Sequence, residues 1–191
     1  GIDGRSLVVV DAVRFLVERQ HLDGSWEEDP TEAENAPIWA VPGNTAAGLY
    51  VTANCAYWVA MTGLVPAAAR DAATYLSFHL GENGALPSFA HTHWLATAVW
   101  RHQGMDDEAA KGLAYLREQI PVLSAGNLAW MILALRQGGV AATESTISAA
   151  VDRLIDLRDP AGHWPADEGA DNAAHVTVEA IHALKLGGRL V

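Results

Sequence analysis

Near its N-terminus the chain reads Phe15-Leu16-x-x-x-Gln20-x-x-Asp23-Gly24-Ser25-Trp26, and weaker copies of this pattern return three more times. The second copy keeps Tyr75-Leu76 and Asn83-Gly84, the third keeps Gly112 and Tyr115-Leu116, and the fourth keeps Leu154 and Gly162-His163-Trp164. The period is irregular, about 35 to 50 residues in the later copies and 60 between the first two, which suits a two-helix unit. The sequence therefore predicts one domain of about four helix-hairpin repeats, at residues 5–64, 65–105, 106–140 and 141–191.

Each copy pairs two helices of different character. In the first helix, apolar residues such as Val13 alternate with charged ones such as Asp11 and Arg14, so one side should meet solvent. The second helix is small and apolar on nearly every face and ends at a glycine, which can take the positive φ of a closing turn. A helix that is apolar all round must be covered by protein or ligand. We therefore expect the second helices, residues 46–63, 90–104, 125–138 and 173–187, to form an inner layer.

Composition fits an all-α protein of this kind and excludes other classes. Half of the residues are hydrophobic and 18% are charged, while the alternating patterns of β-strands are scarce. The net charge of −11 argues against a nucleic-acid partner, and no apolar run reaches the roughly 18 residues of a membrane span. Cys55 is the single cysteine, so no internal disulfide forms, and the first residues lack the pattern of a secretion signal. We expect a cytoplasmic protein.

The first copy resembles the QW repeat of squalene and oxidosqualene cyclases and of the β subunits of protein prenyltransferases. The resemblance spans essentially the whole chain, and the residues that carry it are Gln20, Asp23, Gly24, Trp26, Gly162 and Trp164. It implies an αα-toroid, a barrel whose inner helices surround an apolar cavity for isoprenoid chains. We interpret the six residues as architectural, because glycine supplies a left-handed turn and tryptophan wedges between helices. Four hairpins are fewer than a complete barrel has, so a smaller closed ring or a partial toroid is expected.

Chemistry in such a barrel is expected where the inner helices begin, because unpaired N–H groups and positive helix ends face that rim. Counting back from the aligned glycines, the rim residues are Val51, Thr52, Thr92, His93, Gly126, Asn127, His175 and Val176. The resemblance to triterpene cyclases implies an acidic proton donor at this place. Here His175 stands instead, and the nearest acids are Asp167, Glu168 and Asp171. The catalytic candidates are thus His93, His175 and Asp171.

The resemblance to prenyltransferases implies a zinc site of Asp, Cys and His that activates an acceptor thiol. Cys55 matches the stretch that bears the family's cysteine and His175 the stretch that bears its histidine, but Ala53 stands where the aspartate is expected. Cys55 and His175 are therefore the candidate metal ligands, and His91 or His93 could complete the set. The alternative is that Cys55 is a small buried hydrophobe and that the histidines make ordinary hydrogen bonds.

The acidic segment Glu27-Glu28-Asp29-Pro30-x-Glu32-x-Glu34 is a second candidate metal site. Clustered carboxylates hold Mg²⁺, which can bridge a diphosphate, and a connector of about 18 residues is long enough for a binding loop. The alternative is a solvated acidic loop. The candidate cofactors are therefore Zn²⁺ and Mg²⁺, each with a structural alternative.

Residues on the expected inner helices are candidates for lining a cavity: Tyr57, Trp58, Trp94, Asn127 and Trp130. Aromatic π faces can stabilise a hydrocarbon chain or a carbocation, although aromatic residues at helical spacing also form plain core. The predicted function is that of an isoprenoid-handling protein of the terpene cyclase or prenyltransferase type. The alternative is a non-catalytic αα-toroid that binds a hydrophobic ligand or a protein partner. Because an open crescent exposes apolar faces, we also expect a homo-oligomer or a partner subunit.

Overall fold

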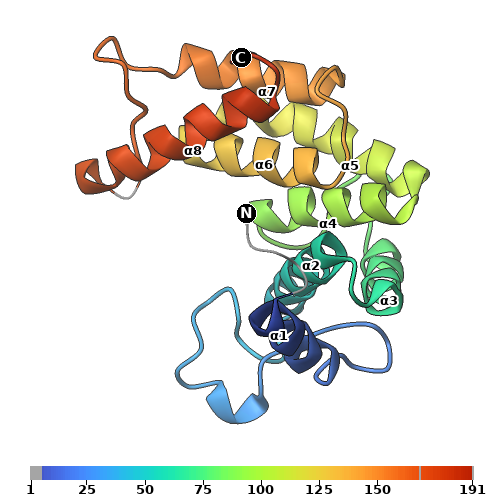
Figure 1. Cartoon of the computed structure of the whole chain (residues 1–191). Helices are drawn as coiled ribbons and strands as arrows, with labels where there is room; N and C mark the ends of the chain where they lie inside the picture. The colour runs from blue at the N-terminus through green and yellow to red at the C-terminus, as the bar shows by residue number, and fades with distance from the viewer. Residues whose placement is uncertain (1–5, 168, 191) are drawn as a thin grey trace. The chain divides into compact units, whose positions relative to one another are not determined.

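The computed structural model describes residues 6–167 and 169–190, and in these residues the fold is all-helical, with no strand (Figure 1). This confirms the predicted all-α class. The helices follow one another as α1 Leu7–Val17, η1 Pro30–Glu32, α2 Thr45–Thr62, α3 Pro66–Phe78, α4 Ala90–Gln103, α5 Asp106–Gln119, η2 Ile120–Val122, α6 Ala125–Gln137, α7 Ser145–Asp156, η3 Ala170–Asn172 and α8 Ala173–Leu186. The α-helices alternate between the amphipathic and the apolar type, in the order predicted for a helical repeat.

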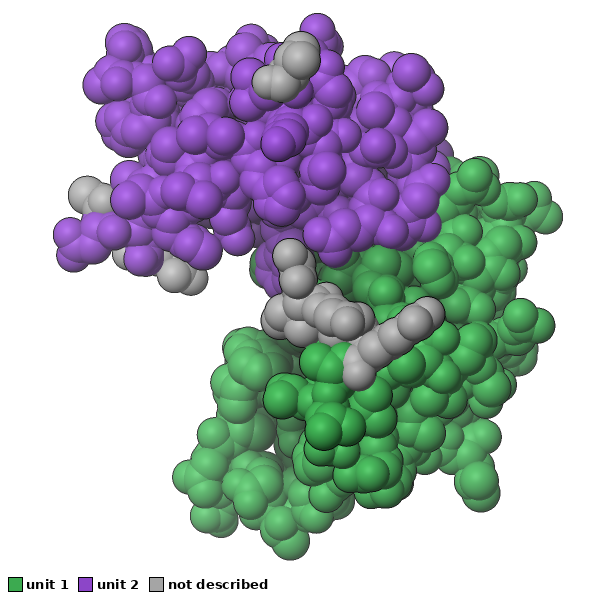
Figure 2. Space-filling model, in the orientation of Figure 1, with its two compact units in different colours: residues 1–112 green, residues 113–191 purple. Residues whose placement is uncertain are grey.

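The chain divides into two compact units, residues 1–112 and 113–191, with the boundary inside α5 (Figure 2). In the first unit α2 packs against α1, α3 and α4. In the second unit α6 packs in the same way against α7 and α8. Each unit therefore contains helix hairpins in which an apolar helix is the centre of packing.

The turn after the first helix of a hairpin has one conserved geometry in three of the four hairpins. In the first, His21 N–H donates to the Ser25 carbonyl at 2.9 Å and Gly24 N–H donates to the His21 carbonyl at 2.9 Å. The same pair of bonds recurs around Gly84 and around Gly162, and all three glycines have φ between +80° and +95°. A residue with a Cβ atom is strained in this left-handed region, so glycine is what lets the turn form.

Two tryptophans lock this turn onto the helix before it. Trp26 Nε1–H donates to the Leu16 carbonyl at 2.7 Å, and Trp164 Nε1–H donates to the Leu154 carbonyl at 2.6 Å. Both indoles are buried, so each supplies apolar area together with a satisfied polar group. The two bonds are equivalent across the repeat, and they give the Trp of the motif a structural role.

Gln20 and Asp23 hold the first turn in place. Gln20 Nε2–H donates to the Gly24 carbonyl at 3.0 Å and to the Ala68 carbonyl, at the start of α3, at 2.9 Å. Asp23 Oδ1 accepts from the hydroxyl and the N–H of Ser25, and these bonds lower the pKa of its carboxyl. The glutamine of the motif thus ties one hairpin to the next.

The left-handed glycine at the end of the apolar helix was predicted correctly for two helices and wrongly for the other two. Gly63 and Gly104 take the left-handed conformation that was expected of them, with φ of +65° and +75°. Gly138 and Gly187 remain right-handed, and the glycines that follow them, Gly139 and Gly188, take positive φ instead. The left-handed residue stands one position later, so the alignment of these two helices moves by one residue.

Candidate functional site

His93, a catalytic candidate, is a buried structural residue. Its Nε2 accepts from Leu86 N–H at 3.0 Å, so the ring proton is on Nδ1, which donates to the Phe89 carbonyl at 3.0 Å. Burial lowers the pKa of the imidazole, which keeps it neutral. Both ring nitrogens are hydrogen-bonded to the backbone. The ring can therefore neither donate nor accept a proton without breaking one of these bonds.

The repeat explains why a histidine stands there. Thr52 Oγ1 accepts from Trp26 N–H at 2.9 Å, and Thr177 Oγ1 accepts from Trp164 N–H at 3.1 Å. His93 does the same for Leu86, the residue that replaces the motif tryptophan in the second hairpin. Each of the three acceptors precedes the left-handed glycine at the end of its helix by the same number of residues. This spacing is a signal in the sequence that was missed. In the fourth hairpin the equivalent residue is Thr177, and the predicted rim pair of His175 and Val176 lies just before it.

His175 and Asp171, the other catalytic candidates, lie on the surface of the second unit. The His175 side chain is 72% exposed, and its Nε2 lies 3.4 Å from Glu179 Oε1, one helical turn further on. Asp171 is exposed in η3. Glu168, one of the acids considered with them, lies outside the described residues. Nothing here provides the buried, neutral acid that a proton donor for alkene chemistry needs.

Cys55 and its surroundings do not fit a zinc site. Burial, with a smaller contribution from the charge of Glu28, raises the pKa of the thiol to about 12. Among the described residues, no group of three or more His, Cys, Asp and Glu side chains gathers as a metal ion requires. His91, the proposed additional ligand, packs edge-on against Tyr50 and Trp94.

The acidic loop uses two of its carboxylates to hold itself together. Glu27 Oε1 accepts from Gly43 N–H, which links the two ends of the loop. Asp29 Oδ1 accepts from both the N–H and the hydroxyl of Thr31, which caps η1 and lowers the pKa of the aspartate. Glu27, Glu28 and Asp29 all line a cavity of about 410 Å³, together with Arg19 and Cys55. Among the described residues, however, no three such side chains come close enough together to hold a metal ion.

The predicted cavity-lining residues differ in how far they are buried. Tyr57 and Trp94 are buried in the first unit, and burial raises the pKa of the Tyr57 hydroxyl to about 12. Asn127 and Trp130 are half-buried on α6 in the second unit. Trp58, in contrast, is 57% exposed. It is the one of these residues that lines a described cavity.

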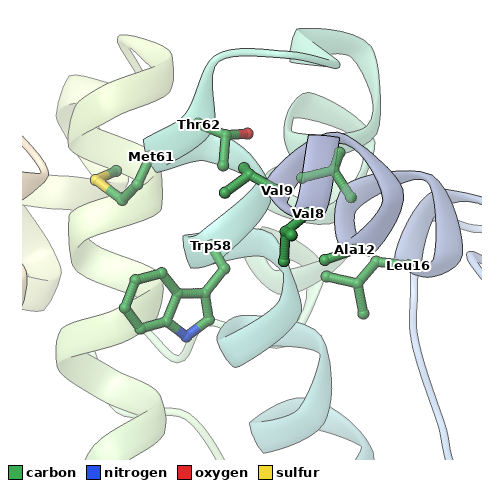
Figure 3. Close-up of a pocket in the computed structure, with 8 residues that line it drawn as sticks. Val8, Val9, Ala12, Leu16, Trp58, Met61 and Thr62 are labelled. Atoms are coloured by element: carbon green, nitrogen blue, oxygen red, sulfur yellow. The ribbon is translucent and has the colours of Figure 1, made fainter. Parts of the chain in front are cut away.

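That cavity is an open groove between α1 and α2, called here the α1–α2 groove (Figure 3). Its volume is about 710 Å³, within the range of about 300 to 1,000 Å³ that small-molecule sites occupy. Its lining is apolar apart from the Trp58 indole N–H and the Thr62 hydroxyl, and that hydroxyl already donates to the Val59 carbonyl at 2.8 Å. The residues that line it are Val8, Val9, Ala12, Val13, Leu16, Trp58, Met61 and Thr62.

Comparison with known proteins adds neither a family nor a relative. No protein-family model matches the chain, and no curated protein matches it. Across residues 6–167 and 169–190, no helix has the length and apolar character needed to cross a bilayer. Function is therefore inferred from the geometry of the molecule.

Proposed function

We propose that this chain is a helical repeat of the αα-toroid type that binds a prenyl or terpenoid chain and does not catalyse its conversion. The α1–α2 groove is the proposed site, and its size and apolar lining are the observation that carries the proposal. The ring arrangement of the hairpins is part of the proposal and comes from the resemblance to the QW repeat.

Binding is favoured over catalysis because each candidate reactive group has another role or environment. His93 is held by two backbone groups, and the Cys55 thiol is protonated at neutral pH because its pKa is raised to about 12. His175 is largely exposed to water, where a reactive intermediate would be quenched.

The lining of the groove selects an uncharged, flexible chain. Each methylene removed from water contributes about 0.8 kcal/mol, so an isoprenoid chain can bind without a polar anchor. Among the described residues, no charged side chain lines the groove, and the one hydroxyl is already engaged. A diphosphate group would gain nothing there, so we propose a neutral prenyl or terpenoid chain as the ligand.

The test is native mass spectrometry of the chain with farnesol and, separately, with farnesyl diphosphate. We expect one farnesol per chain and no tighter binding of the diphosphate. Trp58→Ser should weaken farnesol binding at least tenfold, whereas Phe78→Ser should leave it unchanged, because Phe78 is 81% exposed on α3 outside the groove. Failure to retain either compound, or equal retention by both variants, would show that the groove is not the site.

A further inference from the structure

The turn between α3 and α4 contains Asn83 followed by Gly84, and no other asparagine of the chain precedes a glycine. Such a pair can modify itself without an enzyme. The main-chain nitrogen of the second residue attacks the side-chain amide of the first, and glycine hinders this attack least because it has no Cβ atom. Whether the reaction occurs here depends on how the turn holds the two groups.

The reaction is a deamidation with water as its one co-reactant. The Gly84 nitrogen loses its proton to a base in solution and bonds to Cγ of Asn83. The bond from Cγ to the amide nitrogen breaks, and that nitrogen takes up a proton and leaves as ammonia. Water then opens the resulting succinimide at either of its two carbonyl carbons. One opening gives aspartate at position 83 and the other gives isoaspartate, in which the main chain runs through the side-chain carbon.

In the folded turn both reacting groups are hydrogen-bonded. Gly84 N–H donates to the Gly81 carbonyl at 2.9 Å, so its nitrogen has to give up this bond before it can attack. Asn83 Oδ1 accepts from Ala85 N–H at 3.1 Å, which fixes the side-chain amide. Asn83 itself is exposed, so water reaches it freely. Protection of this site therefore comes from the hydrogen bonds of the turn and not from burial.

Gly81 provides the space that the Asn83 side chain occupies. A Cβ atom on Gly81 would lie 2.9 Å from Asn83 Oδ1 and 3.2 Å from the Ala85 carbonyl oxygen, both closer than ordinary contact. The φ angle of Gly81 is not positive, so an alanine is compatible with its backbone conformation. Gly81→Ala should therefore displace the Asn83 side chain while leaving the helices folded.

We infer that Asn83–Gly84 is a deamidation site that the folded turn suppresses and that local opening of the turn exposes. Opening of this kind, without global unfolding, is a general property of connecting segments. The site belongs to the second hairpin alone and does not depend on the proposed ligand.

The two products should have opposite effects on the fold. Aspartate is compatible with the turn, because Asp23 stands at the equivalent position of the first hairpin and its Oδ1 accepts from Ser25 N–H at 3.0 Å. Isoaspartate adds a methylene to the main chain between Gly81 and Ala85, so the bonds that close the turn no longer fit together. The next residue, Leu86, gives its N–H to His93, and the damage therefore extends to α4.

Peptide mapping by mass spectrometry of the chain aged in mildly alkaline buffer, with and without urea, tests this inference. We expect deamidation of Asn83 in urea to be at least tenfold faster than in the folded chain. Asn127, which precedes a leucine, is the internal control and should react slowly in both samples. No preferential reaction at Asn83 in urea, or equal rates in the two samples, would overturn the inference.

A pair of glycine variants tests the role of the side-chain bond. Gly81→Ala should raise the rate at Asn83 in the folded chain at least threefold. Gly48→Ala is the matched control and should leave it unchanged, because a Cβ atom there would meet nothing within 4 Å. Circular dichroism checks that both variants are folded. A folded Gly81→Ala variant with the wild-type rate would contradict the protection assigned to the turn.

Refolding after ageing in urea gives a second readout that needs no glycine variant. Chains that carry isoaspartate at position 83 should be depleted from the refolded, protease-resistant fraction, whereas unaged Asn83→Asp should refold like the wild type. Equal recovery of chains with isoaspartate would show that the turn tolerates the longer main chain, and poor recovery of Asn83→Asp would refute the comparison with Asp23.

Discussion

Gly24 and Gly162 form a matched pair for testing how neighbouring hairpins pack. Both have φ above +90°, so replacement by alanine places a Cβ atom in the left-handed region at a cost of about 1 to 2 kcal/mol at either position. At Gly24 the new Cβ atom would also lie 2.5 Å from the backbone of Asp71, which cannot move without shifting α3. Overpacking of this kind adds about 1 to 3 kcal/mol.

We therefore expect Gly24→Ala to lower the free energy of unfolding by about 2 to 5 kcal/mol and Gly162→Ala by about 1 to 2 kcal/mol. At Gly162 the neighbour within 4 Å is the mobile end of the Arg158 side chain, which can turn aside. Urea denaturation followed by circular dichroism measures both values. Equal losses of unfolding free energy in the two variants would refute this expectation, because the close approach of α3 to Gly24 would then cost nothing.

Three further predictions follow from the same structure. Because its pKa is raised to about 12, Cys55 should react with iodoacetamide at pH 7.5 far more slowly in the folded chain than in urea, and rapid labelling of the folded chain would contradict this. His93 has a lowered pKa in the folded state, so the unfolded chain binds more protons below about pH 6.5, and the free energy of unfolding should fall as pH drops from there. His93→Thr, which copies Thr52 and Thr177, should reduce that dependence in urea titrations at several pH values; an unchanged dependence would assign it to other groups.

The helices could be predicted because their signals are local. The apolar periodicity around Val13 and the turn glycine Gly24 report on backbone geometry within a few residues, and the all-α class follows from them. The left-handed glycine of the last inner helix was misplaced by one position, since Gly187 and Gly188 are adjacent and the pattern cannot choose between them.

The role of His93 could not be read from the sequence, because its partner is the N–H of Leu86, whose availability depends on the turn before α4. From the sequence alone, a histidine such as His93 is readily interpreted as a reactive group. In this fold the same position is held by threonine in two other hairpins, which shows that the requirement is a hydrogen-bond acceptor.

The sequence also could not show which apolar residues of the first and last described hairpins are exposed. Val8 and Ile181 look like core residues, and their equivalents in interior hairpins are buried. Whether such a residue is buried depends on the hairpin that packs against it and not on the residue itself.

Photo-crosslinking with a diazirine-bearing prenyl alcohol, followed by mapping of the labelled peptides, tests whether the chain binds an isoprenoid in the α1–α2 groove. We expect labels on α1 and on the part of α2 that contains Trp58 and Met61, and unlabelled farnesol should compete them away. Labels confined to other helices, or labels that farnesol does not displace, would contradict it.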